Sequence, residues 1–371
     1  MKEELPLIRF VKRKLSDEKY EACAVFDVNG DGIADIVSGA YWYEGPDYAR
    51  KHFIAEVMPI DGYHDDFSDY PMDVDGDGWP DIITGAWWGR TLRWRRNPGE
   101  AGVPWETFDI DECGCIETIR FYDIDGCGVP EIFPNTPGEP QAFYKLIRDA
   151  DGKGTGRFRK TVISEGPSGH GMGFADVNGD GRMDIVLNEG WLEQPDDPFA
   201  GPWRFHPEFS LGGASVPILG YDVTGNGLTD LIVGQAHDYG LHWYEQRLAE
   251  DGTRTWIKHL IDDSGSQFHD LWLADLDGDG QPELITGKRY RAHNDGDPGA
   301  HDPIGIYYYR INGGAFEKHV IDFGPAGEAS GAGIYFWVQD LTGNGYPDIV
   351  APGKDGLYLF ENQGPEEKDQ A

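Results

Sequence analysis

The sequence predicts an all-β protein built from one repeated unit. An acidic motif of nine residues recurs seven times, as DVNGDGIAD, DVDGDGWPD, DIDGCGVPE, DVNGDGRMD, DVTGNGLTD, DLDGDGQPE and DLTGNGYPD. The copies begin at Asp27, Asp73, Asp123, Asp176, Asp222, Asp275 and Asp340. Their starts lie 46 to 65 residues apart, which suits four short strands with their turns rather than a helical repeat. Because a propeller blade has this size, the repeat predicts a single seven-bladed β-propeller over residues 1–371.

The segments around each motif are expected to form the strands of one blade. An apolar strand such as DIVSGA follows the motif, and an aromatic strand such as LHWYEQ comes next. A fourth strand such as TWIKHLI then follows, but none follows LYLFEN near the C-terminus. The segment LIRFVKRKL, residues 7–15, has the missing pattern. We therefore expect this N-terminal strand to complete the last blade, which would close the ring and leave no open sheet edge.

The acidic motifs have the oxygen donors of a calcium site. In DVDGDGWPD, side chains at positions 1, 3, 5 and 9 would converge, because the glycines at positions 4 and 6 permit a tight turn. Hard oxygen ligands in a flexible ring suit calcium. The alternative is that these aspartates and asparagines only cap the backbone amides of their own turns.

This pattern resembles the FG-GAP or VCBS repeats of integrin-type propellers, and the resemblance covers nearly the whole chain. The resemblance implies calcium ligands in four loops, with the most carboxylates in the second and sixth. These ligands are Asp27, Asn29, Asp31 and Asp35; Asp73, Asp75, Asp77 and Asp81; Asp176, Asn178, Asp180 and Asp184; and Asp275, Asp277, Asp279 and Glu283. In the third loop Cys127 replaces an oxygen ligand, which argues against calcium there.

The charge of the chain restricts its partners. With 31 Lys+Arg against 66 Asp+Glu, the net charge of -35 would repel nucleic acid and anionic membranes, and it favours cations or neutral partners. The start MKEELPLIRF lacks the apolar core of a signal peptide. We expect no nucleic-acid or membrane partner, and a cytoplasmic chain as written, or a secreted or periplasmic one if a signal peptide was removed.

Candidate functional residues gather at the ends of the strands opposite the acidic loops. Residues that precede an innermost strand or follow a second strand would meet at the mouth of the central channel. The candidates for acid–base chemistry are His64, His170, His237, His269, Lys288 and Tyr290, and those for substrate binding are Trp191, Arg289, His293 and Lys354. The long segment KRYRAHNDGDPGAHDP of the sixth blade should fold over the same face. The histidines could instead hold zinc or another divalent ion, or serve structural roles.

The phrases GHGMGFADVNGDGRMDIVLNEGWLEQP and TGKRYRAHNDGDPG resemble the propeller domain of the aldos-2-ulose dehydratase family. The resemblance implies a lyase that removes water from a small keto-sugar such as 1,5-anhydrofructose or glucosone. Elimination beta to a ketone needs a base, an enolate stabiliser and an acid. We assign these roles to His170 or His269, to Lys288 or a bound metal, and to Tyr290 or His64. Two alternatives are a polysaccharide lyase and a non-enzymatic sugar- or protein-binding propeller of integrin type.

Overall fold

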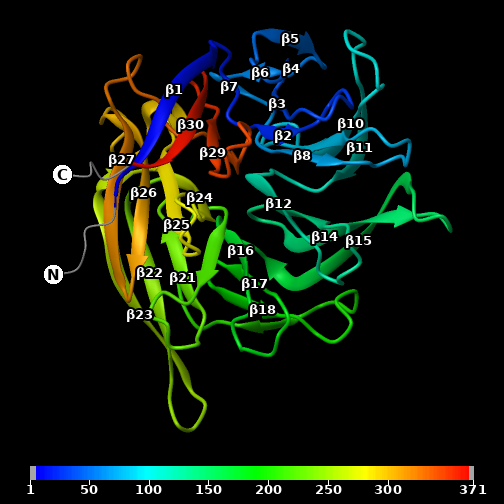
Figure 1. Cartoon of the computed structure of the whole chain (residues 1–371). Helices are drawn as coiled ribbons and strands as arrows, with labels where there is room; N and C mark the ends of the chain where they lie inside the picture. The colour runs from blue at the N-terminus through cyan, green and yellow to red at the C-terminus, as the bar shows by residue number, and fades with distance from the viewer. Residues whose placement is uncertain (1–5, 367–371) are drawn as a thin grey trace.

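The computed structural model describes residues 6–366, and its regular elements in this range are β-strands apart from one 3-10 turn, η1 (Ala292–Asp295). The strands follow one another as antiparallel groups of four (Figure 1). The first two groups contain β2 (Ala24–Phe26), β3 (Asp35–Ser38), β4 (Tyr41–Glu44) and β5 (Arg50–Phe53), then β8 (Asp69–Met72), β9 (Asp81–Thr84), β10 (Thr91–Arg96) and β11 (Glu106–Glu112). A two-stranded hairpin of β6 (Pro59–Ile60) and β7 (Tyr63–His64) lies between them in the chain.

The following groups have the same plan. They contain β12 (Thr118–Tyr122), β13 (Glu131–Asn135), β14 (Pro140–Arg148) and β15 (Gly154–Pro167), then β16 (Met172–Ala175), β17 (Asp184–Leu187), β18 (Gly190–Glu193) and β19 (Arg204–His206), then β20 (Ile218–Tyr221), β21 (Asp230–Gly234), β22 (Tyr239–Leu248) and β23 (Arg254–Ser266). The remaining strands are β24 (Phe268–Ala274), β25 (Glu283–Lys288), β26 (Ile304–Asn312) and β27 (Ala315–Gly324), then β28 (Trp337–Gln339), β29 (Asp348–Ala351) and β30 (Leu357–Pro365), which β1 (Ile8–Ser16) joins.

Two of these groups are linked into one eight-stranded sheet. The first strands β16 and β20 pair in parallel, with Gly173 opposite Ile218. A Cβ atom at position 173 would collide with the Ile218 carbonyl oxygen, so glycine permits this close approach. Within residues 6–366, no helix has the length and apolar character that a membrane crossing requires.

The N-terminal strand pairs with the last strand of the chain, as the sequence predicts. Residues Ile8–Ser16 form β1, which runs antiparallel to β30 with Val11 opposite Glu361 and Arg13 opposite Leu359. Figure 1 shows the blue β1 beside the red β30. The two ends of the described chain are therefore joined by backbone hydrogen bonds, and β1 covers the edge that β30 would otherwise expose.

Each acidic motif joins the first strand of a group to the second, and its first carboxylate caps the turn. Asp27 accepts hydrogen bonds from the backbone amides of Gly30, Asp31 and Gly32 at 2.7, 3.2 and 2.8 Å. Gly30 and Gly32 have φ values of 74° and 83°, the left-handed region that glycine enters without strain. Capping therefore accounts for the repeated aspartate and glycines, and calcium binding stays a prediction.

The ninth residue of each motif is a buried carboxylate that links neighbouring strands. Asp184 begins β17 and accepts the amide of Val177 in the loop at 3.0 Å and that of Gln194 after β18 at 2.9 Å. The equivalent residues, all buried at the start of the second strand, are Asp35, Asp81, Glu131, Asp230, Glu283 and Asp348. Burial raises the pKa of every one of these carboxyl groups, to about 7 in Asp184.

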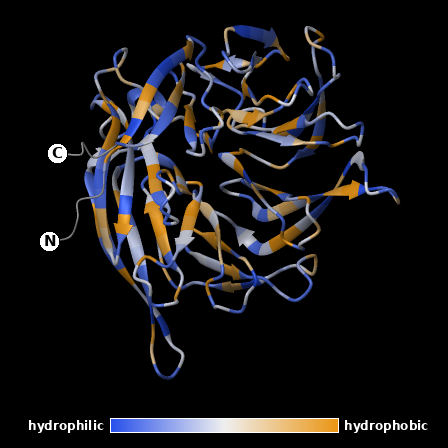
Figure 2. Cartoon of the chain, viewed as in Figure 1, coloured by the Kyte–Doolittle hydropathy of each residue, from blue (hydrophilic) through white to orange (hydrophobic). Residues whose placement is uncertain are grey.

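The cores lie between adjacent groups, and the hydropathy colouring shows alternating apolar and polar residues along many strands (Figure 2). Several third strands carry a tryptophan that stacks on a histidine of the fourth strand. Trp191 and His206 are stacked with ring centroids 4.1 Å apart, and His206 Nε2 lies 2.7 Å from a Glu193 oxygen. Trp42 with His52 and Trp243 with His259 repeat this contact. These outer histidines therefore have a structural role.

We predict that the buried carboxylates make the protein less stable as pH rises. A carboxyl group whose pKa is raised in the folded state stabilises that state when protonated, and this contribution is lost between about pH 4 and the folded value of about 7. In chelator, urea unfolding should show lower stability at pH 8 than at pH 5. Asp184→Asn should reduce that difference by about 1 kcal/mol or more, and Asp180→Asn should change it less. An unchanged difference in Asp184→Asn would contradict the assignment.

We also predict that deletion of residues 1–15 lowers the melting temperature by several degrees and broadens the transition, because β30 loses its partner strand. Calorimetry of this variant and of a control lacking only residues 1–5, which leaves Ile8–Ser16 intact, would measure the effect. Equal melting of the long deletion and the parent would show that the pairing does not hold the fold together.

Candidate functional site

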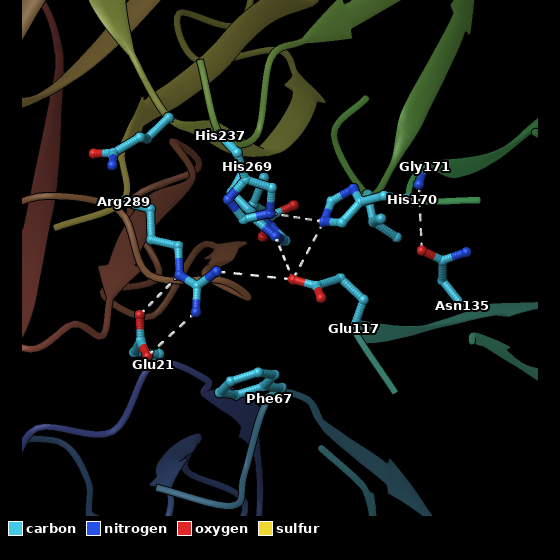
Figure 3. Close-up of polar contacts among 12 residues, drawn as sticks. Glu21, Phe67, Glu117, Asn135, His170, Gly171, His237, His269 and Arg289 are labelled. Atoms are coloured by element: carbon cyan, nitrogen blue, oxygen red, sulfur yellow. Dashed lines mark hydrogen bonds and ion pairs between the residues drawn. The ribbon is translucent and has the colours of Figure 1, made fainter. Parts of the chain in front are cut away.

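A carboxylate and three imidazoles meet at the ends of the strands opposite the acidic loops. Glu117 Oε1 lies 2.9 Å from His269 Nε2 and 3.3 Å from His170 Nε2, and His170 Nε2 lies 3.1 Å from His237 Nε2 (Figure 3). One ligand atom from each of the four residues can be chosen so that all lie within 4.8 Å of one another. These contacts connect the groups that contain β12, β16, β21 and β24.

The strand topology explains why these residues meet. Glu117 directly precedes β12, His170 lies just before β16, His237 follows β21, and His269 is the second residue of β24. Asn135 at the end of β13 supports two of these segments, since its carbonyl accepts the Glu117 amide at 2.9 Å and its side-chain oxygen accepts the Gly171 amide at 3.3 Å.

The hydrogen bonds define the proton positions on two of the rings. His170 Nδ1 lies 2.8 Å from the Ala214 carbonyl oxygen, and His237 Nδ1 lies 3.0 Å from Asp297 Oδ2, so each Nδ1 carries a proton. Their Nε2 atoms face each other at 3.1 Å, where two lone pairs would repel. A proton or a metal ion between them removes that repulsion. His269 Nδ1 has no hydrogen-bond partner among the described residues.

The pKa shifts of the cluster differ between Glu117 and the three imidazoles. Burial raises the pKa of Glu117, but the charges and hydrogen bonds of His170 and His269 lower it well below its usual range. Burial alone would lower the pKa of His170, yet the Glu117 carboxylate raises it overall. Burial lowers the pKa of His237 to about 4 and that of His269 well below its usual range. Among these imidazoles, His170 is therefore the one whose charged form Glu117 favours.

A buried arginine lies next to this cluster. Arg289 Nε donates to Glu21 Oε1 at 2.9 Å, and its Nη1 lies 3.8 Å from Glu117 Oε1. Both Arg289 and Glu21 are almost fully buried, so the pair is sheltered from solvent. Figure 3 shows Arg289 between the two carboxylates. The guanidinium adds positive charge to the wall of the site.

A cavity of about 440 Å³ adjoins the cluster. One part of its wall is aromatic, and the other part is polar. The aromatic residues are Tyr63, Phe67, Trp87 and Trp88, and the polar residues are Asp61, Glu117, His170, His237, Arg289, His293 and Asn294. The Trp88 ring lies 4.8 Å from Tyr63 and 5.5 Å from Phe67, centroid to centroid, so the aromatic wall is a packed unit. This size and lining suit a small polar ligand with an apolar face.

The sixth-group insertion after β25 covers part of this face. Lys288 Nζ donates to the carbonyl oxygens of Gly299 and Asp302, and Lys354 Nζ donates to that of Arg291 at 2.8 Å. The Lys354 ammonium also lies 3.2 Å from the centre of the Tyr63 ring, and burial lowers its pKa to about 8. Both lysines hold the insertion in place and do not belong to the four-residue cluster.

The structure brings together only part of the predicted site. His170, His237, Arg289 and His293 line the cavity and His269 lies directly behind it. Three other candidates lie outside the described lining: His64 contacts the Lys19 carbonyl and Tyr20, Tyr290 is half-buried beside Arg289, and Trp191 packs on His206.

Sequence reasoning missed several residues of the site. Glu21, Asp297 and the aromatic pair Trp87 and Trp88 were not among the candidates. Glu117 precedes a first strand on the expected face but was given no role. Trp87 and Trp88 follow the second strand β9, which is the position that placed His237 in the set. The same topological rule could therefore have found them, whereas Asp297 lies in an irregular insertion without such a signal.

Comparison with known proteins supports the repeat. An FG-GAP-like repeat matches residues 222–286, which include the fifth and sixth acidic motifs. No curated protein matches the chain. Among solved structures, an Agrocybe aegerita lectin described as recognising non-reducing terminal N-acetylglucosamine is similar at 16% identity and a TM-score of 0.48, covering 93% of this chain and 90% of the lectin. The V. cholerae biofilm matrix protein Bap1 is similar at 16% identity and a TM-score of 0.34, covering 91% of this chain and 44% of Bap1.

Proposed function

We propose that the chain forms a single seven-bladed propeller of FG-GAP-like repeats. Each of the seven acidic motifs lies between the first two strands of an antiparallel group, which supports one motif per blade. The parallel contact of β16 with β20 is then a contact between two neighbouring first strands near the central axis. The pairing of β1 with β30 completes the last blade.

We propose that the central cavity is the active site of a lyase that removes water from a small keto-sugar. The observation that carries this proposal is the convergence of Glu117, His170 and His237 at the wall of a 440 Å³ cavity, with His269 directly behind them. Four contacting titratable groups with shifted pKa values beside a cavity favour chemistry over simple binding. The volume of about 440 Å³ suits a small sugar.

The donor set fits zinc or a similar divalent ion. Three imidazole nitrogens and one carboxylate oxygen are common zinc ligands. His170 and His237 also make the outer hydrogen bonds that orient histidine ligands, to the Ala214 carbonyl and to Asp297. These four residues would hold the ion, and if it accepted the ketone oxygen as a further ligand it would supply Lewis acidity there.

The chain's own residues can bind and orient the sugar. The Trp88 and Tyr63 rings offer an apolar surface to a sugar face, and the Arg289 guanidinium favours negative charge that develops in the cavity. With His170, His237 and His269 engaged in the cluster, His293 is the remaining imidazole that lines the cavity. Asp297 Oδ1 orients it through Nδ1 at 2.8 Å. We therefore propose His293 Nε2, in place of His170 or His269, as the base for the proton next to the ketone.

We predict that the parent protein converts 1,5-anhydrofructose or glucosone to an enone, detected by its ultraviolet absorbance. His293→Ala should lower turnover about 100- to 10,000-fold, because the base is lost, and His170→Ala and His269→Ala should lose turnover with the cluster. The control is His301→Ala, which changes an exposed histidine of the same insertion. His293→Ala and His301→Ala should melt like the parent, whereas His269→Ala also removes a fully buried ring that contacts Glu117 and should lower the melting temperature. Sugar binding by the parent with no release of water would contradict the lyase and favour a binding propeller.

We also propose that the second and sixth acidic loops bind calcium. Asp73, Asp75 and Asp81 form one compact oxygen group, and the sixth loop contains another. Arginine side chains share these carboxylates, since Arg96 Nε lies 2.6 Å from Asp75 Oδ2 and Arg310 Nη2 lies 3.0 Å from Asp277 Oδ2. Calcium would therefore have to displace part of an existing ion pair.

We predict that calcium added to chelator-treated protein raises its melting temperature through ligand linkage. Asp77→Ala should remove part of that increase, whereas Arg96→Gln should preserve or enlarge it because a competing cation is lost. Scanning calorimetry with elemental analysis measures both. No bound calcium and no thermal response would leave turn capping as the sole role of these loops.

A further inference from the structure

His237 takes part in two separate groups of possible metal ligands. Its Nε2 lies 3.1 Å from His170 Nε2 in the central cluster, whereas its Nδ1 lies 3.0 Å from Asp297 Oδ2 on the insertion. The two nitrogens of an imidazole point away from each other, so the ring separates two sites that share it. His237 is therefore placed to connect the cluster with a second set of donors.

The second donor set consists of His237, His293 and Asp297. Asp297 Oδ1 lies 2.8 Å from His293 Nδ1, and the His237 and His293 rings are stacked with centroids 4.3 Å apart. One ligand atom from each of these residues can be chosen so that all lie within 4.8 Å of one another. The Nδ1 atoms of His237 and His293 thus both point at the Asp297 carboxylate. A divalent ion could take the place that the two Nδ1 protons now occupy between the rings and the carboxylate.

One side of this donor set is buried and the other side is open to solvent, as in a metal site that an ion can reach. The Asp297 side chain is 9% exposed, which excludes water from the carboxylate, whereas the His293 side chain is 59% exposed. Both histidines line the cavity, so solvent or substrate can supply the remaining ligands. The neighbouring cation Arg291 is occupied by Asp295 at 2.9 Å and does not compete for Asp297.

The insertion that carries His293 and Asp297 is held in position at several points. Lys354 Nζ binds the Arg291 carbonyl at 2.8 Å, and the Asn294 side chain donates to the Asp61 carbonyl at 2.5 Å. Lys288 binds the carbonyl oxygens of Gly299 and Asp302 beyond Asp297. The two donors are therefore fixed against His237 before any ion arrives, which reduces the ordering cost of binding.

We propose that His237, His293 and Asp297 form a second divalent-ion site, with His237 bridging it to the central cluster. Two imidazole nitrogens and one carboxylate oxygen suit zinc or a similar ion, and the exposed side leaves an open position. When both ions are bound, His237 coordinates through both nitrogens and its Nδ1 proton passes to the solvent. The second site binds more weakly than the first because it has fewer protein ligands.

The second site has a consequence for the reaction, and this consequence rests on the proposed function. When an ion binds His293 Nδ1, the proton of the ring moves to Nε2. The Nε2 atom can then no longer accept the proton of the substrate. Occupancy of the second site should therefore slow elimination, and an excess of zinc should inhibit an enzyme that needs zinc in the first site.

In the alternative, Asp297 does not bind an ion itself. It only orients His237, a ligand of the central cluster, through the hydrogen bond to His237 Nδ1. Carboxylates that orient a histidine ligand strengthen metal binding by about 10- to 100-fold. In that case the protein binds one ion only, and Asp297→Asn weakens it. A bridged pair instead gives two ions, and loss of His293 removes just one of them. The number of bound ions separates the two accounts.

Zinc titration of the chelator-treated full chain against a chromophoric chelator tests the site without any enzyme assay. We expect two bound equivalents, the second at least about tenfold weaker than the first. His293→Gln should abolish the second equivalent and change the first less than about threefold, because His293 is not a ligand of the first site. Glu117→Gln should weaken the first equivalent. His301→Gln, which changes an exposed histidine of the same insertion, is the matched control and should keep both.

Three results would overturn the proposal. The first is a parent protein that binds no more than one equivalent. The second is a second equivalent that survives both His293→Gln and Asp297→Asn. The third is a second equivalent that is lost in His301→Gln as readily as in His293→Gln. Because the readout is metal content, absence of lyase activity in the parent would refute the proposed function without changing this result.

Discussion

The fold depends on one repeated interaction, the buried carboxylate that begins the second strand of each group. In Asp184 both oxygens accept backbone amides, one from the acidic loop and one from the end of the third strand. This single side chain therefore fixes the loop and three strands relative to one another. Burial of a carboxylate is costly unless its oxygens are hydrogen-bonded, and here the backbone satisfies both. The geometry recurs with Asp35, Asp81, Asp230 and Asp348.

Because the acidic loops use one end of every group for structure, the opposite strand ends are available for chemistry. Glu117 and His170 precede first strands there, and His237 and Arg289 follow second strands. These strand ends bring together charged groups from distant parts of the sequence. The Arg289 guanidinium, which is paired with Glu21, also lies close enough to Glu117 to offset part of its negative charge. The insertion then adds His293 and Asp297 to one side of the same cavity.

The repeat made much of the fold predictable from sequence. Its spacing predicted the strand groups, and the missing fourth strand after LYLFEN predicted the pairing of β1 with β30. The topological rule also predicted that His170, His237 and His269 would meet. The rule could not resolve side-chain direction: Trp191 lies on the third strand β18 and stacks outward on His206. His64 lies in the short hairpin of β6 and β7, which has no counterpart in the repeat.

Irregular segments limited the prediction of the remaining site. Lys288 ends β25 as expected, but its ammonium is taken up by carbonyl oxygens of the insertion. Asp297 follows a stretch in which His293 and Asn294 have left-handed backbone angles, and no sequence periodicity predicts such a conformation. These contacts depend on tertiary packing rather than on local pattern.

The central claim is that Glu117, His170, His237 and His269 form a metal centre. Anomalous diffraction at the zinc edge from crystals of the zinc-loaded protein tests it most directly. The account predicts a peak bonded to the three imidazoles and the carboxylate, at about 2.0–2.2 Å from each ligand atom. Zinc found only at the acidic loops, with these four side chains still hydrogen-bonded to one another, would contradict it.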